Sequence, residues 1–95
     1  MTIKGNILLG TKVLKNSAVL DFGSITPSTG LELTVNVPGA VSGDYVILGL
    51  PSGLEAGLIV NGRVSSNDTV TVRVSNITAG AIDPASATYK VMVLQ

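Results

Sequence analysis

Hydrophobic and polar positions alternate over short stretches of this chain. The clearest stretch covers residues 31–37, where every second residue is apolar: Leu31, Leu33, Val35 and Val37 alternate with Glu32, Thr34 and Asn36. A period of two is typical of a half-buried antiparallel strand. Similar patterns predict five further strands, over residues 17–25, 45–50, 58–65, 69–75 and 89–94, and one or two weaker strands between residues 3 and 14.

Turn residues between these stretches indicate how they connect. Ser66-Asn67-Asp68 separates residues 58–65 from residues 69–75, so these two strands are predicted to form a hairpin with Arg63 and Arg73 on its outer face. Residues 45–50 are apolar on both faces, which predicts a central strand. The connection over residues 51–57 leaves room for a helical turn at residues 52–56.

The pattern therefore predicts an all-β fold. No window of the chain has a convincing helical period, and short strands separated by Gly and Pro are typical of a sandwich or small barrel. We expect one small antiparallel β-sandwich over residues 17–95, jelly-roll-like or immunoglobulin-like, with about seven to eight short strands. Residues 1–16 are expected to form an N-terminal arm.

The composition excludes several kinds of chemistry. The 95 residues include no Cys, His or Trp, so the chain offers no thiol nucleophile, no Cys/His zinc site and no imidazole base. Six basic residues balance six acidic ones, and a neutral chain is a poor candidate for binding nucleic acid. No apolar run approaches the roughly 20 residues that span a bilayer, and the start lacks a signal-peptide pattern. We expect no membrane partner and synthesis in the cytoplasm.

Individual polar residues are better explained by structure than by catalysis. The six carboxylates show no spacing typical of a general acid–base pair or a calcium loop, so a carboxylate-dependent hydrolase is the weakest rival function. Asp44, Asp68 and Asp83 are expected in turns, bonded to nearby backbone amides. We predict no enzyme activity, no catalytic residue, no cofactor and no metal site.

Two further features, a pair of tyrosines and a short sequon, are better explained by structure than by function. The aromatic residues Tyr45 and Tyr89 are predicted to be core rings whose hydroxyl groups reach the surface, rather than a platform for stacking sugars. Residues 76–78, Asn-Ile-Thr, fit a glycosylation sequon, and we interpret this match as chance.

Charge is unevenly distributed along the neutral chain. Residues 1–16 hold Lys4, Lys12 and Lys15 and no acid, a charge of +3, whereas residues 17–95 hold three basic and six acidic residues, a charge of −3. Only 13% of residues are charged, and a small domain with such a surface tends to associate. We predict a homo-oligomer in which the three lysines contribute to partner binding. The alternative is an ordinary terminus with solvated lysines.

Four blocks of the chain resemble a known family. They are residues 20–25 (LDFGSI), 37–44 (VPGAVSGD), 54–58 (LEAGL) and 81–89 (AIDPASATY). Together, across residues 17–94, the sequence resembles small virion proteins of tailed bacteriophages, of the head-fibre and head-decoration (capsid cement) type. The resemblance implies a non-enzymatic structural protein on the outside of the capsid, a homotrimer with the major capsid protein as its partner. The alternative function is a phage tail or fibre module that recognises a host surface glycan or protein.

Overall fold

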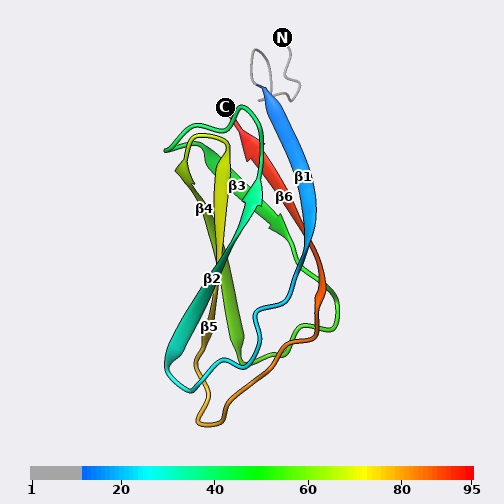
Figure 1. The fold of residues 1–95 in the computed structure, drawn as a ribbon, viewed down its shortest axis with the longest axis vertical. Coiled ribbons are helices and arrows are strands. Elements are labelled where there is room, and N and C mark those ends of the chain that lie inside the picture. Colours follow the sequence, from blue (N-terminus) through cyan, green and yellow to red (C-terminus); the bar gives the residue numbers. More distant parts are fainter. Residues whose placement is uncertain (1–11) are drawn as a thin grey trace, which may run out of the picture.

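Two three-stranded antiparallel sheets pack face to face in the computed structural model, which describes residues 12–95 (Figure 1). One sheet has the strand order β1 (Val13–Leu20), β6 (Ala87–Leu94), β3 (Tyr45–Gly49). The other has the order β2 (Thr29–Asn36), β5 (Thr69–Asn76), β4 (Leu58–Ser66). The described residues contain no helix, and residues 51–58 form two turns, closed by bonds from Leu54 N to Pro51 O and from Leu58 N to Glu55 O.

The predicted all-β sandwich is confirmed, although the described residues form six strands rather than seven or eight. The first strand runs from Val13 to Leu20, four residues earlier than predicted, because residues 13–16 pair with residues 91–94 of β6. Of the predicted weak strands between residues 3 and 14, residues 3–11 lie outside the described residues, and Val13 and Leu14 belong to β1. After β1 the chain leaves the sheet, and Ile25 makes an isolated bridge with Ile82.

The strand pairing is nested. The first strand pairs with the last over eight residues, and the second pairs with the fifth over eight residues. Consecutive strands β1 and β2 therefore lie in different sheets. An immunoglobulin fold places its first two strands in one sheet. Of the two predicted topologies the structure is closer to a jelly roll, with fewer strands than the usual eight.

The core lies between the inner faces of the two sheets. Every second residue of β5 and β6 is buried there, together with residues from the loops. The buried apolar side chains are Leu20, Phe22, Ile25, Val35, Val37, Ala40, Leu58, Val64, Val70, Val72, Val74, Tyr89, Val91 and Val93. Phe22 and Tyr89 make an edge-to-face contact with ring centroids 5.7 Å apart.

One strand is placed differently from its prediction. Strand β3 was expected to be central because residues 45–50 are apolar on both faces, but it is an edge strand and β6 occupies the centre of the sheet. Its inner residues Val46 and Leu48 pack over β4 at Gly62, where an added Cβ would lie 3.2–3.3 Å from their methyl groups. Its outer residues Tyr45 and Ile47 face away from the core, so burial in the core does not explain why this outer face is apolar.

A buried asparagine, Asn76, fixes one end of the sandwich. This end consists of residues 21–28, 50–57 and 77–86 and is here named the Asn76 end. Asn76 is 1% exposed, and its Nδ2 donates to the carbonyl oxygens of Ile25 (2.9 Å) and Gly80 (2.8 Å). Its Oδ1 accepts hydrogen bonds from the backbone N (2.9 Å) and hydroxyl (2.7 Å) of Thr78. The side chain satisfies groups on two loops, so the sequon-like Asn-Ile-Thr pattern has a structural explanation.

We expect Asn76→Ala to lower the free energy of unfolding by about 2–4 kcal/mol, because several buried polar groups lose their partners at once. Asn76→Asp should destabilise comparably, since a carboxylate cannot donate to the Ile25 and Gly80 carbonyls. Urea unfolding measures both effects. The control Asn61→Ala, at an exposed position of β4, should change stability by less than about 0.5 kcal/mol. An Asn76→Asp variant as stable as the native chain would contradict this account.

Candidate association face

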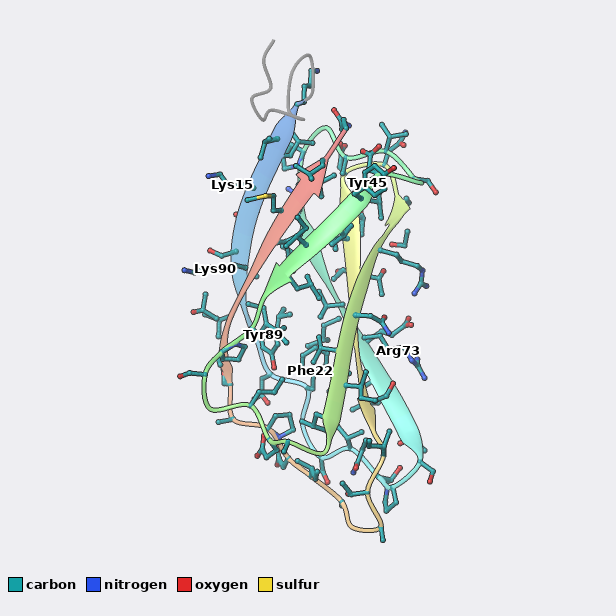
Figure 2. All side chains as sticks on the ribbon, turned by 180° about the vertical axis from the view of Figure 1, so that it is seen from behind. Lys15, Phe22, Tyr45, Arg73, Tyr89 and Lys90 are labelled. Carbon is teal, nitrogen blue, oxygen red and sulfur yellow. The ribbon has the colours of Figure 1, made fainter. Side chains whose placement is uncertain are left out.

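The two outer faces of the sandwich differ in chemistry. The outer face of β2–β5–β4 is polar apart from the exposed Ile59, and Glu32 of the edge strand β2 pairs with Arg73 of β5 (3.3 Å) and Arg63 of β4 (3.5 Å). Both arginines lie on the outer face, as predicted, and Figure 2 shows Arg73 on the side opposite Lys15 and Lys90. Such exposed ion pairs contribute about 0–1 kcal/mol. This face is compatible with solvent as it stands.

The outer face of β1–β6–β3, here named the lysine face, combines apolar side chains with two cations. Tyr45 is 76% exposed and Ile47 is 51% exposed, although both are large apolar residues. The register places Met92 between Lys15 and Ile47, and Lys90 between Ser17 and Gly49. The face consists of Val13, Lys15, Ser17, Val19, Tyr45, Ile47, Gly49, Thr88, Lys90, Met92 and Leu94.

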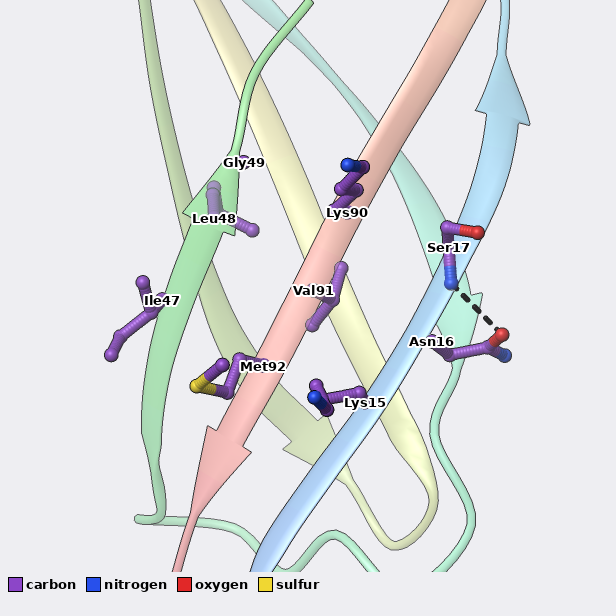
Figure 3. Close-up of a pocket in the computed structure, with 9 residues that line it drawn as sticks. All are labelled: Lys15, Asn16, Ser17, Ile47, Leu48, Gly49, Lys90, Val91 and Met92. Atoms are coloured by element: carbon purple, nitrogen blue, oxygen red, sulfur yellow. Dashed lines mark hydrogen bonds between the residues drawn. The ribbon is translucent and has the colours of Figure 1, made fainter.

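An open groove of about 470 Å³ crosses the centre of the lysine face (Figure 3). Ile47 and Met92 line it beside Lys15, and the aliphatic stem of Lys90 lies over Gly49, with its Cβ 3.1 Å from where a Cβ of Gly49 would lie. Lysine stems often cover apolar surface while the ammonium group stays in water. An open, mostly apolar surface with cations at its border suits a protein partner better than an enclosed small molecule.

The three predicted partner-binding lysines have different places. Lys15 lies on β1 within the groove, opposite Met92. Lys12 is exposed just before β1, and its carbonyl oxygen accepts a hydrogen bond from Gln95 N (3.0 Å). Lys4 lies outside the described residues. The expected arm over residues 1–16 thus contributes its last four residues to β1, where the Asn16 side chain also donates to the Asn36 carbonyl of β2.

Both tyrosine predictions need correction. Tyr45 is not a core ring, because it begins an edge strand on the outward-facing parity and is exposed. Tyr89 is a core ring with 0% exposure, but its hydroxyl does not reach the surface and has no hydrogen-bond partner within residues 12–95. Burial and, less strongly, the negative charge of Glu55 raise the pKa of Tyr89 above 10.0.

The carboxylates mostly serve the backbone. Asp44 accepts a hydrogen bond from Val41 N (2.9 Å), and Asp68 accepts one from Gly39 N (2.7 Å), so the turn predictions for these two residues are confirmed. Asp83 lies outside any turn and accepts no hydrogen bond from a backbone amide of residues 12–95, so its prediction is wrong. Asp21 follows β1 instead of lying within a strand, and it accepts from Gly23 N (3.2 Å). Within residues 12–95 no three Asp or Glu residues cluster as metal ligands would.

No helix long and apolar enough to cross a membrane occurs in the part of the chain that the structure describes.

The lysine face was not predicted from the sequence, because an apolar run in both parities also fits a strand that is buried on both faces. Residues 45–49 and 91–94 are apolar in both parities, and for residues 45–50 this pattern led to the prediction of a central strand. In a two-layer sandwich each strand has one inner face only. Apolar residues in both parities of two paired strands therefore predict an exposed apolar surface, and this signal could have identified the site.

Comparisons with known proteins add no assignment: the chain matches no protein-family model, no curated protein and no solved structure.

The unpartnered hydroxyl of Tyr89 generates a test of the core. We expect Tyr89→Phe to retain or raise the free energy of unfolding by up to about 2 kcal/mol, because a buried polar group without a partner is removed. Since the pKa of Tyr89 is raised in the folded chain, its ionisation opposes folding, and the native chain loses further stability as pH rises above the unfolded pKa of about 10.

Urea titrations of both chains between about pH 8 and 11 provide the measurement. The advantage of the Tyr89→Phe variant over the native chain should grow above about pH 10, where the unfolded native chain loses the tyrosine proton first. A variant less stable than the native chain at neutral pH would indicate that the hydroxyl has a stabilising partner.

Proposed function

We propose that this protein is a non-enzymatic structural component of a tailed-phage virion, which decorates and stabilises the outside of the capsid as a homo-oligomer. The observation that carries the proposal is the lysine face. It exposes apolar side chains across a whole sheet, whereas the outer face of the opposite sheet is polar apart from Ile59. Exposed apolar patches of this kind on soluble domains mark interaction surfaces.

The physical basis of the proposed mechanism is binding energy. Removing apolar surface from water stabilises a contact by roughly 25 cal/mol per Å². Several copies joined in one oligomer bind a repetitive capsid together, so each contact can be weak. A protein that binds the assembled capsid better than its separated subunits shifts the equilibrium toward assembly. Synthesis in the host cytoplasm, followed by attachment to the capsid exterior, fits this mechanism.

The family resemblance supports the proposal through the fold. Each resembling block contributes buried residues: Phe22 and Ile25 in the first, Val37 and Ala40 in the second. Leu58 ends the third block, and Pro84 and Tyr89 are buried in the fourth. The blocks therefore lie in the loops and the adjoining strand ends that complete the core. These are positions that a shared fold would keep similar.

The proposed capsid contact involves the beginning of the chain. Residues 1–12 carry Lys4 and Lys12, and Lys15 follows on β1. An extended arm can bind a partner by adding a strand to an exposed sheet edge, which gives specificity through backbone hydrogen bonds. The arm and the lysine face then make different contacts. The arm binds the major capsid protein, and the lysine face binds other copies of the chain.

One observation favours the alternative, a tail or fibre module that recognises a host glycan or protein. Tyr45 is an exposed ring beside the groove, and exposed aromatic faces stack on sugars. Glycan-array binding that disappears in Tyr45→Ala would favour this alternative over capsid decoration.

Purified virions from the genome that encodes this chain provide the main test. We expect mass spectrometry to detect the chain in heads separated from tails, and purified protein to cosediment with heads that lack it. Added protein should also raise the temperature at which such heads release their DNA. Detection in tails alone, or failure to bind heads, would contradict the proposal.

A deletion that ends before β1 isolates the contribution of the arm. Removing residues 1–11 should leave thermal unfolding almost unchanged and reduce head binding by at least about tenfold. Removing residues 1–16 should also destabilise the fold, because residues 13–16 form half of β1 and pair with β6. Circular dichroism melting and cosedimentation measure the two effects. Head binding that survives removal of residues 1–11 would exclude the arm as the docking element.

A further inference from the structure

The lysine face carries uncompensated positive charge. Lys15 and Lys90 are exposed, and the strand register places no Asp or Glu on this face among residues 12–95. Both ion pairs of the described residues use Glu32 on the opposite sheet. Neither Lys15 nor Lys90 therefore has a carboxylate partner within residues 12–95. Whatever covers the face meets two ammonium groups beside Ile47 and Met92.

A symmetric contact of the face with itself is disfavoured by this charge. In a two-fold interface the same surface patch is present on both subunits. Lys15 and Lys90 of both copies would then enter one interface without any acid from either face. Like charges brought together in an interface oppose binding, whereas complementary charges select orientation. The face therefore fits a different, acidic surface.

The Asn76 end of the molecule offers such a surface. Glu55 and Asp83 are exposed, and neither takes part in a side-chain hydrogen bond or ion pair with residues 12–95. Asp21, Asp44 and Asp68, in contrast, accept backbone hydrogen bonds within the chain. Glu55 borders a hollow of about 100 Å³ whose remaining lining is apolar or small: Pro51, Gly53, Leu54, Pro84, Ala85 and Ala87.

We propose that the lysine face of one copy binds the Asn76 end of the next copy, with Lys15 and Lys90 paired to Glu55 and Asp83. This inference rests on the self-association in the proposed function and names the two surfaces that form the contact. Because the surfaces differ, the contact is heterologous. Such a contact forms a closed ring, such as the trimer that the family resemblance implies, when the rotation between copies closes, and an open filament when it does not. The first eleven residues are a poorer cover for the face, since their one charged side chain, Lys4, has the same sign.

Charge reversal on the full-length chain tests the contact. Sedimentation velocity at several concentrations should give an oligomer for the native chain that dissociates as NaCl rises from about 0.05 to 0.5 M. Lys15→Glu/Lys90→Glu and Glu55→Lys/Asp83→Lys should each raise the dissociation constant at least about tenfold. The chain with all four substitutions, whose net charge equals that of the native chain, should recover association.

Matched controls separate the contact from general charge and hydrophobicity. Arg63→Glu/Arg73→Glu changes the net charge as much as Lys15→Glu/Lys90→Glu does, but on the opposite sheet. This variant should leave the mass of the oligomer unchanged. Ile47→Ser should weaken association, whereas Ile59→Ser should not, because Ile59 is similarly exposed (49%) on the outer parity of β4 in the other sheet. Circular dichroism checks that every variant is folded.

Several outcomes would overturn the proposal. These are a native chain that stays monomeric, a fourfold variant that is folded but dissociated, and reversals without effect. Dissociation on removal of residues 1–11 alone would assign the face to that segment. Binding of the monomer to phosphatidylglycerol vesicles, lost in Lys15→Glu/Lys90→Glu, would assign it to a membrane. None of these measurements uses heads, so head binding by a monomer would leave capsid decoration standing while this contact falls.

Discussion

Each strand of a two-layer sandwich has only one face that the other layer can cover, and this constraint governs the molecule. The inner face of β6 carries Tyr89, Val91 and Val93 into the core, so Lys90 and Met92 must face outward. The same holds for β3, where Val46 and Leu48 pack inward and Ile47 is left exposed. With only two layers, no strand has a neighbouring layer on both sides. The lysine face follows directly from this geometry.

Loops complete what six short strands cannot bury alone. Phe22 and Ile25 enter the core from the connection after β1, and Val37 and Ala40 enter it from the connection after β2. Such loops carry backbone groups that leave the strand ladders and need other partners. Asn76 provides them at one end, and at the other end the backbone of Asp68 bonds to Val37 N (2.7 Å) and Ala40 O (2.9 Å). Polar contacts thus fix the loops at both ends of the apolar centre.

The strands were predictable from local pattern, and their arrangement was not. Local pattern located all six strands, since alternation, apolar runs and turn residues are local properties; residues 31–37 are the clearest example. The first strand was placed four residues too late, because the pairing of residues 13–16 with β6 is not local. Partner choice is non-local: nothing in residues 45–50 says that they lie at an edge beside β6. Tyr45 and Tyr89 look alike in sequence and occupy opposite environments for that reason. The asparagine of the sequon-like pattern, likewise, reveals its four hydrogen bonds only when Ile25 and Gly80 are brought to it.

The chain has no net charge, but its unpaired positive and negative side chains lie on different surfaces. This separation of charge decides which surface the lysine face can bind. On one sheet Glu32 offsets part of the positive charge of two arginines, and three aspartates accept hydrogen bonds from backbone amides. The charges left without such partners within residues 12–95 lie apart, with cations on the lysine face and carboxylates at the Asn76 end. Apolar contact alone is non-directional, so the lysine face could pair with any apolar surface. Its two lysines make pairing with a like surface unfavourable and pairing with an acidic one favourable. Affinity from the apolar side chains and orientation from the charges are therefore separate properties of one face.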